Sequence, residues 1–317
     1  MFNVGIIGTG SIATKMAEAI KELRGACVYA VASRDLDRAK AFVKKNCPKA
    51  KPVGSYEEFA YMDELDLIYV ATPNTYHYEN ALTCIKAGKN VLIEKPFTMS
   101  RAEADSIFTE AKNRGVFVCE AMWTAFMPLH KTMLKWVREG KIGSVRYISS
   151  NLGYNIENVK RLTDPALGGG AYLDLGVYTT HLAVSILGEN IEPKSVYARK
   201  LSNGIDRDVT YILGPQGDGA ISSSYVTMSS LTDRDGAIVG EKGYIKLFNI
   251  NNYERIELHD DTGALVEAYD QEGLSGYSLE VKGCKDAIEN GLIQCPEMPW
   301  NRTAAICSIN DRIRSMM

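Results

Sequence analysis

The stretch Val4-Gly5-Ile6-Ile7-Gly8-Thr9-Gly10-Ser11-Ile12-Ala13 decides how the chain begins to fold. Its short apolar run, Val4–Ile7, predicts a buried strand, and two glycines follow at once. From Ile12 to Leu23, apolar residues then recur at helical spacing. A strand, a glycine turn and a helix in this order give the context in which G-x-G-x-x-G/A indicates a dinucleotide-binding βαβ unit. The alternative is a glycine turn with a structural role only.

Each small residue of this turn has a physical reason to be there. Gly8 permits the tight turn, and Gly10 has no side chain to keep a pyrophosphate away from the backbone. Ala13 is small enough for the helix to lie close to the strand, and the helix N-terminus offers free N–H groups to the phosphates. The predicted cofactor-binding residues here are Gly8, Thr9, Gly10, Ser11 and Ile12.

The end of the second strand, Val28–Ala32, indicates which dinucleotide binds. An NAD-specific site usually carries an acidic residue at this point for the ribose hydroxyls, but Ser33 stands there and Arg34 follows. A guanidinium suits a 2′-phosphate, so the sequence favours NADP over NAD, with Ser33 and Arg34 as contacts. The alternative for Arg34 is an ordinary exposed arginine. Asp35 is predicted to cap the next helix.

Strands and helices continue to alternate up to about residue 121, which predicts a doubly wound parallel sheet. The strand Leu67–Ala71 ends at Thr72-Pro73-Asn74, and the strand Asn90–Ile93 ends at Glu94-Lys95-Pro96. Ligands of such sheets bind beyond the carboxyl ends of the strands, so Lys95 is a candidate functional residue. The alternative is that Glu94 and Lys95 form a solvated strand end.

The second part of the chain, residues 122–317, has a different character. A connecting helix at 126–139 is followed by short predicted strands at 145–150, 196–200, 209–213, 220–228, 244–248 and 255–258, separated by polar or glycine-rich turns. This pattern predicts an α+β domain with a mainly antiparallel sheet and an embedded helix at 174–187. Two final helices, 278–289 and 301–314, complete it, and their packing back on the first domain is left open.

Composition excludes several classes of function. A length of 317 residues suggests two domains, and 45% hydrophobic and 24% charged residues are ordinary for a soluble protein. A net charge of −3 gives no electrostatic reason to expect nucleic acid or an anionic membrane as partner. Seven scattered cysteines indicate reduced thiols in the cytoplasm, without a disulfide frame or a metal site. We find no signal-peptide pattern and no apolar run of the ~20 residues that cross a bilayer.

The motifs together resemble a known family. The glycine turn, Thr72-Pro73-Asn74 with His77, Ala87-Gly88-Lys89 and Glu94-Lys95-Pro96 are similar, in residues and spacing, to the glucose–fructose oxidoreductase/inositol dehydrogenase/rhizopine catabolism (Gfo/Idh/MocA) family of NAD(P)-dependent oxidoreductases. The resemblance continues through the segments 167–176, 238–245 and 296–300, so it covers nearly the whole chain. It implies cofactor contacts from Thr72, Pro73, Asn74, His77, Glu94 and Lys95.

Within the family, Glu120-Ala121-Met122-Trp123-Thr124 followed by Phe126 and Pro128 resembles the branch of dimeric dihydrodiol dehydrogenases and NADP-dependent xylose dehydrogenases. Members of that branch usually carry Trp-Thr-Arg-Phe, whereas Ala125 replaces the arginine here, which puts the substrate in doubt. The resemblance also implies an open-faced sheet in the second domain, and with it a homodimer or homotetramer.

Oxidation of an alcohol with NADP requires removal of a hydride from carbon and of a proton from oxygen. Asp174, Tyr178 and His181 follow one another at steps of four and three, so they share one face of the predicted helix. The resemblance implies that Tyr178 is the proton donor or acceptor, with Lys95 favouring its phenolate and Asp174 orienting the lysine or a hydroxyl. Trp123, Phe126 and His181 are candidate substrate residues, although packing roles are the alternative for each.

Three functions remain open at this stage. The first is an NADP-dependent dehydrogenase of a sugar, polyol or dihydrodiol. The second is a non-catalytic NAD(P)-binding regulator on the same fold, which would tolerate loss of Lys95 and of the Asp174/Tyr178 pair; both are intact. The third is an enzyme that cycles a tightly held cofactor between two sugars, for which the sequence shows no secretion segment or extended N-terminal arm.

Overall fold

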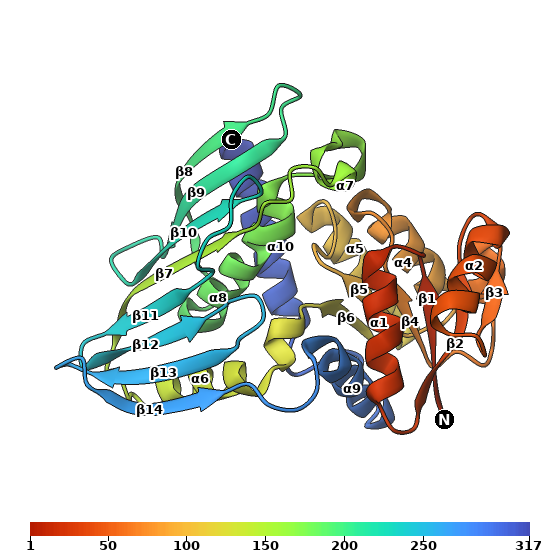
Figure 1. Cartoon of the computed structure of the whole chain (residues 1–317), viewed down its shortest axis with the longest axis horizontal. Coiled ribbons are helices and arrows are strands. Elements are labelled where there is room, and N and C mark those ends of the chain that lie inside the picture. Colours follow the sequence, from red (N-terminus) through yellow and green to blue (C-terminus); the bar gives the residue numbers. More distant parts are fainter. The chain divides into compact units, whose positions relative to one another are not determined.

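A computed structural model describes all residues, 1–317, and the chain divides into two compact units (Figure 1). The first unit contains Met1–Trp123 and Leu274–Thr303, and the second contains Thr124–Gly273 and Ala304–Met317. The segment 274–303, predicted from sequence within the second part of the chain, therefore belongs to the first unit.

The first unit is built on a six-stranded parallel sheet in the order β3-β2-β1-β4-β5-β6, the arrangement of doubly wound dinucleotide-binding domains. Its strands are β1 (Phe2–Ile7), β2 (Ala26–Ala32), β3 (Lys51–Val53), β4 (Leu67–Val70), β5 (Val91–Glu94) and β6 (Val118–Ala121). Every residue of β4, β5 and β6 is buried, because helices cover both faces of a parallel sheet. This explains why these strands are mainly apolar rather than alternating, with Glu94 and Glu120 as the buried exceptions.

Helices connect these strands, and several of them begin or end at capping residues. They are α1 (Ser11–Glu22), α2 (Leu36–Asn46), α3 (Tyr56–Ala60), the short η1 (Asn74–Tyr76), α4 (His77–Lys86), α5 (Arg101–Arg114) and the later α9 (Gly276–Glu289). Asp35, Ser55 and Ser100 each accept backbone N–H groups as N-caps, and Gly115 ends α5 with φ +65°. Helix α9 packs on α1, where the Ser278 hydroxyl donates to Glu22 at 2.6 Å.

The second unit is built on an eight-stranded sheet in the order β14-β13-β12-β11-β7-β10-β9-β8. Its strands are β7 (Val145–Gly153), β8 (Glu192–Lys200), β9 (Asp206–Gly214), β10 (Ile221–Thr227), β11 (Gly236–Gly240), β12 (Gly243–Phe248), β13 (Arg255–Asp260) and β14 (Leu265–Asp270). Only β7 and β10 pair in parallel, so the sheet is mainly antiparallel, as predicted.

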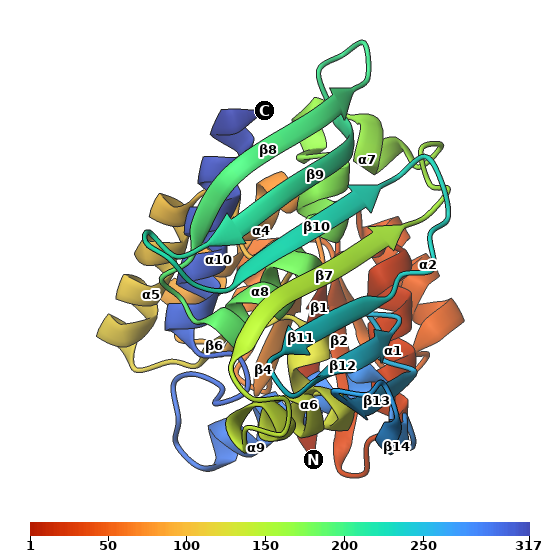
Figure 2. The same cartoon turned by 90° about the vertical axis from the view of Figure 1, so that its left-hand side faces the viewer.

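One face of this sheet is covered and the other is open. The helical elements are η2 (Trp123–Phe126), α6 (Pro128–Arg138), α7 (Lys160–Thr163), η3 (Pro165–Leu167), η4 (Tyr172–Gly176), α8 (Val177–Leu187) and α10 (Trp300–Met316), the last of which begins within the first unit. Helix α8 contacts β7 and β10, and the alternate residues Ile148, Ile238 and Ile245 are fully buried on that side. Figure 2 shows the opposite face with no helix over it.

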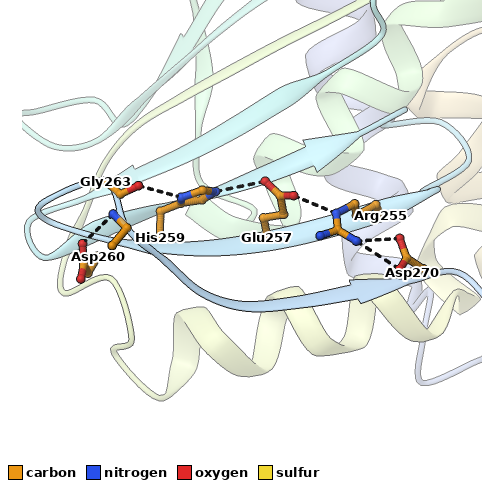
Figure 3. A network of polar contacts seen from close by, with 7 residues as sticks. Arg255, Glu257, His259, Asp260, Gly263 and Asp270 are labelled. Atoms are coloured by element: carbon orange, nitrogen blue, oxygen red, sulfur yellow. Dashed lines mark hydrogen bonds and ion pairs between the residues drawn. The ribbon is translucent and has the colours of Figure 1, made fainter.

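Polar contacts run along β13 and tie it to β14 (Figure 3). Arg255 donates to Glu257 at 2.8 Å and to Asp270 at 3.0 Å, and His259 lies 3.1 Å from Glu257 and 3.1 Å from the Gly263 carbonyl. The hydrogen bond from Arg255 is the main reason that the pKa of Glu257 is lowered. The edge of the sheet is therefore ordered by an ion-pair chain.

Three strands, β3, β11 and β14, are not among the sequence predictions. All seven cysteines are unpaired, and six of them are buried. None of the helices is both long and apolar enough to span a membrane.

Candidate functional site

The glycine turn after β1 leaves space for a phosphate group. Gly8 has φ +115°, and a Cβ there would lie 2.5 Å from the Ala71 carbonyl oxygen, so only glycine fits beside the end of β4. A Cβ at Gly10 would meet nothing within 4 Å. Gly10 is also the N-cap of α1 and gives that helix no side-chain cap. The first N–H groups of α1 thus lack a side-chain acceptor, which fits the pyrophosphate of a dinucleotide.

Ser33 and Arg34 lie at the end of β2, with Ser33 buried and Arg34 exposed. The Ser33 hydroxyl accepts the Asp35 N–H at 3.3 Å, and the Arg34 guanidinium lies 5.2 Å from the centre of the Tyr76 ring. A cation over a ring face is attracted to it, so Tyr76 restricts where Arg34 points.

A cavity of about 300 Å³ lies between the glycine turn and α2. Its lining residues are Thr9, Thr14, Arg38, Ala41, Phe42, Lys45 and Asn46. Two of them, Arg38 and Lys45, are cations that sequence reasoning did not single out. One feature of the sequence points to Arg38: it stands four residues after Arg34, on the other side of the start of α2.

His77 ties the ends of β4 and β5 together. Its Nδ1 atom lies 2.8 Å from the Pro96 carbonyl oxygen, its Nε2 atom lies 2.9 Å from that of Thr72, and the side chain is 1% exposed. Both ring nitrogens therefore face backbone carbonyls that leave the sheet at the same edge.

Glu94, the last residue of β5, is a buried carboxyl group at 6% exposure. It accepts a hydrogen bond from the Tyr69 hydroxyl and another, at 3.1 Å, from the backbone N–H of Lys95. The Lys95–Pro96 peptide bond is cis. The segment that carries Lys95 is thus held by side chains from β4, β5 and α4.

In the second unit, the helix that bears Asp174 begins with a π turn. Residues Tyr172–Gly176 form this turn, and α8 continues from Val177. A Cβ at Gly176 would lie 2.4 Å from the Tyr172 ring, so the turn requires glycine there. The Gly176 carbonyl accepts hydrogen bonds from Thr179 and Tyr211, both at 3.0 Å. Single π turns of this kind occur frequently at functional sites.

Asp174 and Tyr178 are both buried at 7% exposure. Arg161 of α7, which sequence reasoning missed, donates to the Asp174 carboxylate at 3.0 Å. This pairing favours the ionised form of Asp174 and restricts its orientation.

Asp206 of β9 supports the start of the same helix. Its carboxylate accepts the Tyr172 N–H at 2.7 Å, and a Cβ at Gly170 would lie 2.2 Å from it. Burial raises the pKa of Asp206 to about 6, although the Tyr172 N–H acts in the opposite direction. The glycine run before Asp174 thus makes room for a buried carboxyl group.

The predicted substrate residues have well-packed surroundings. His181 is 1% exposed, stacks on His130 at 5.1 Å, and lies 3.4 Å from the Thr124 hydroxyl and 3.3 Å from that of Ser185. Phe126 is 4% exposed. Trp123, in the first unit, packs edge-on against Tyr277 at 4.0 Å.

The structure thus gathers the predicted residues into two sets. The first unit holds the glycine turn, Ser33, Arg34, Thr72, Pro73, Asn74, His77, Glu94, Lys95 and Trp123, and the second holds Phe126, Asp174, Tyr178 and His181. No group of three or more His, Cys, Asp or Glu side chains is arranged to hold a metal ion.

Two family models match the chain. One is described as an oxidoreductase family with an NAD-binding Rossmann fold and matches residues 2–122. The other is a GFO/IDH/MocA C-terminal domain and matches residues 130–246. Together they span more than half of the sequence.

Curated proteins of similar length are also similar in sequence. The trans-1,2-dihydrobenzene-1,2-diol dehydrogenase of Xenopus laevis is 33% identical over 318 residues, covering 97% of this chain and 95% of that protein. The Bos taurus protein of the same name is 32% identical over 323 residues, covering 98% and 95%.

Solved structures share the fold. KijD10, a 3-ketoreductase from Actinomadura kijaniata solved with NADP and TDP-benzene, has a TM-score of 0.89 at 24% identity, covering 99% of this chain and 97% of that one. An aldose-aldose oxidoreductase from Caulobacter crescentus has a TM-score of 0.87 at 19% identity over the same fractions.

Replacement of His77 tests how the Lys95 segment is held. His77→Ala removes both contacts between the ring and the Pro96 and Thr72 carbonyls, so we expect a loss of about 2–4 kcal/mol in unfolding free energy. Amide exchange of residues 94–97, followed by mass spectrometry, should accelerate, whereas the exposed Tyr61→Ala control should leave it unchanged. Unaltered exchange in His77→Ala would show that the ring does not hold this segment.

Proposed function

The chain belongs to the Gfo/Idh/MocA family of NAD(P)-dependent oxidoreductases, and on that premise we propose that it transfers a hydride between NADP and a carbon bearing a hydroxyl or carbonyl group. The substrate class we propose is a dihydrodiol, sugar or polyol. The observation that carries this proposal is the similarity, over 97% of the chain, to proteins named trans-1,2-dihydrobenzene-1,2-diol dehydrogenase.

The first unit supplies the proposed cofactor site. The uncapped N-terminus of α1 and the open position at Gly10 suit the pyrophosphate, and Thr72, Pro73 and Asn74 lie at the end of the neighbouring strand β4. When bound, the nicotinamide accepts or supplies the hydride. The chain itself has to bind the dinucleotide, orient the substrate and move one proton.

Three cations support a preference for NADP over NAD. Arg34 lies at the end of β2 where an acidic residue would favour NAD, and Arg38 and Lys45 line the nearby cavity. Guanidinium groups bind phosphate through paired hydrogen bonds, so Arg34 and Arg38 suit the 2′-phosphate that distinguishes NADP.

Tyr178, Lys95 and Asp174 are the proposed catalytic residues. A phenol is a competent general acid or base when a neighbouring cation favours its phenolate form, and Lys95 is the proposed cation. Asp174 is held by Arg161, which supports its role as an orienting carboxylate. Trp123, Phe126 and His181 are proposed to shape the substrate pocket. Ala125, where the related dehydrogenases carry arginine, is 2% exposed and leaves the identity of the substrate open.

The open face of the second unit supports self-association. Across six neighbouring strands, one residue of each strand pairs with one residue of the next, in the order Leu265, His259, Tyr244, Val239, Tyr147 and Ile221. Ile245, next to Tyr244 in the sequence, and Ile238, next to Val239, are buried in the core. Since successive side chains of a strand point to opposite faces, this row lies on the open face. A continuous aromatic and aliphatic row suits a second copy of the chain, in a homodimer or homotetramer. Seven free thiols support a reducing, cytoplasmic location.

Substitution of the catalytic residues tests the reaction. Lys95→Ala and Tyr178→Phe should each lower kcat by about 10²–10⁴-fold, because each removes a group needed for proton transfer. Binding of NADPH, measured by fluorescence, should be retained. Near-normal turnover in either variant, across a panel of aldoses, polyols and diols, would contradict that residue's role. A wild-type protein that binds NADPH but oxidises no member of the panel would favour a regulator.

Substitution of Arg34 tests the cofactor preference. Arg34→Ala should raise the Kd for NADPH about tenfold or more and leave that for NADH nearly unchanged, because only NADPH carries the 2′-phosphate. Arg101→Ala removes an arginine of α5 that is paired with Asp105, and it serves as the control. Equal changes for both dinucleotides would refute the assignment of Arg34.

A charge on the open face tests self-association. Val239→Glu places a carboxylate in the middle of the apolar row and should reduce the molar mass measured by light scattering to that of a smaller assembly. Leu231→Glu, at a residue that is 69% exposed outside the sheet, is the control. A monomeric wild-type protein would rule out the proposed assembly.

A further inference from the structure

Glu120 is a buried carboxyl group that the proposed reaction does not yet explain. It lies on β6 and is 1% exposed. In the parallel pairing of β5 with β6, Glu120 is opposite Ile93, and Ala121 is opposite Glu94. The side chain therefore lies beside the point where β5 ends and the Lys95 segment begins.

The carboxyl group has one hydrogen bond to that segment. Its Oε1 atom accepts the backbone N–H of Phe97 at 3.2 Å, and its Oε2 atom has no hydrogen-bond partner. Each of the residues 94–97 is thus held by a polar contact. Tyr69 donates to Glu94, and Glu94 accepts the Lys95 N–H. The His77 ring contacts the Pro96 carbonyl, and Glu120 accepts the Phe97 N–H. A buried acid without a full set of donors is costly for folding, so a simple structural role is a poor explanation.

The charges around Glu120 come mainly from the end of β5. Burial raises the pKa of Glu120 to about 7, while the nearby Thr303 hydroxyl and the Phe97 N–H lower it; Glu94 raises it and Lys95 lowers it. The groups that act on it are therefore Glu94 and Lys95 from β5 and its continuation, and the uncharged Thr303 from α10. Glu120 therefore changes its charge in the neutral pH range, and its ionised form is a stronger acceptor for the Phe97 N–H than its neutral form.

We propose that Glu120 is a positioning residue for Lys95, which fixes the backbone after the lysine through the Phe97 N–H and holds it more firmly when ionised. This inference rests on the proposed function, because it takes Lys95 to be the cation that assists proton transfer. It follows that Glu120, which is not one of the proposed substrate contacts, contributes to the pH dependence of turnover.

The sign of the effect follows from the charges. Below about pH 7 Glu120 is protonated and neutral, and above it the carboxylate accepts the Phe97 N–H in a charge-assisted hydrogen bond. Turnover therefore rises through neutral pH as the Lys95 segment is held more firmly, and loss of the carboxylate removes this rise. The inflection near pH 7 that belongs to Glu120 disappears.

Glu120→Gln separates the two parts of the role. Glutamine keeps an acceptor for the Phe97 N–H and nearly the same volume, but it cannot ionise. In the full-length protein we expect the inflection near pH 7 to disappear from the profile of kcat/KM, with the Kd for NADPH unchanged. A profile that overlays that of the wild type, or that falls by one factor at every pH, would overturn the proposal.

Thr303→Val provides a second variant that keeps the carboxyl group. Loss of the hydroxyl removes an interaction that lowers the pKa of Glu120, so the inflection near neutral pH should move to higher pH. This variant carries the test should Glu120→Gln fail to fold, and an unmoved inflection would overturn the proposal.

Glu280→Gln is the matched control. Glu280 of α9 is fully buried, both of its carboxyl oxygens lack hydrogen-bond partners, and burial raises its pKa well above the ordinary value. Because neither of its oxygens bonds to residues 94–97, its replacement should leave the inflection near pH 7 in place, and loss of that inflection would overturn the proposal.

The outcome for Lys95 distinguishes this inference from the function on which it rests. Near-normal turnover in Lys95→Ala would overturn both. An inactive Lys95→Ala, together with an unchanged pH profile in Glu120→Gln, would overturn only the role of Glu120.

Discussion

A carboxylate buried at the end of a strand has to be satisfied by hydrogen bonds, and the first unit is organised around that requirement at Glu94. Tyr69 donates to one oxygen, and the backbone N–H of Lys95 donates to the other. Both donors are fixed by the sheet, since Tyr69 lies on the adjacent strand β4 and is fully buried. The direction in which the chain leaves β5, and hence the position of Lys95, follows from this carboxylate.

The second unit meets a similar requirement in a different way. A π turn leaves backbone carbonyls without their usual helical donors, and the Gly176 carbonyl is satisfied by the hydroxyls of Thr179 and Tyr211. Asp206 accepts the N–H of Tyr172 at the start of the same turn. Asp174 lies within this irregular turn and Tyr178 follows it. The shape of the turn is therefore fixed by polar side chains rather than by regular helical hydrogen bonds.

The sequence predicted the elements whose signals are local. Asp35 is an N-cap as predicted, and Ser55 and Ser100 cap their helices in the same way, because capping depends on a side chain and the next three residues. Strand β3 has only three residues and offers no periodicity, and β14 is an exposed edge strand with little apolar contrast. The association of α9 with α1, and the contacts of Arg161 and Glu120, join residues far apart in the sequence. No local pattern reports such contacts.

Three buried carboxyl groups in the first unit bear on the choice between an enzyme and a protein that only binds a nucleotide. Glu94, Glu120 and Glu280 are 6%, 1% and 0% exposed, and Glu280 has no hydrogen-bond partner at all. Apolar side chains of similar size would stabilise this core more, since burial of an acid opposes folding even in its neutral form. Of the three acids, only Glu94 is among the proposed cofactor contacts, and none lies at the glycine turn, the start of α1 or the end of β2. Glu94 and Glu120 both bond to the segment that carries Lys95, the proposed catalytic cation. That placement favours an enzyme that moves a proton over a protein that only binds a nucleotide.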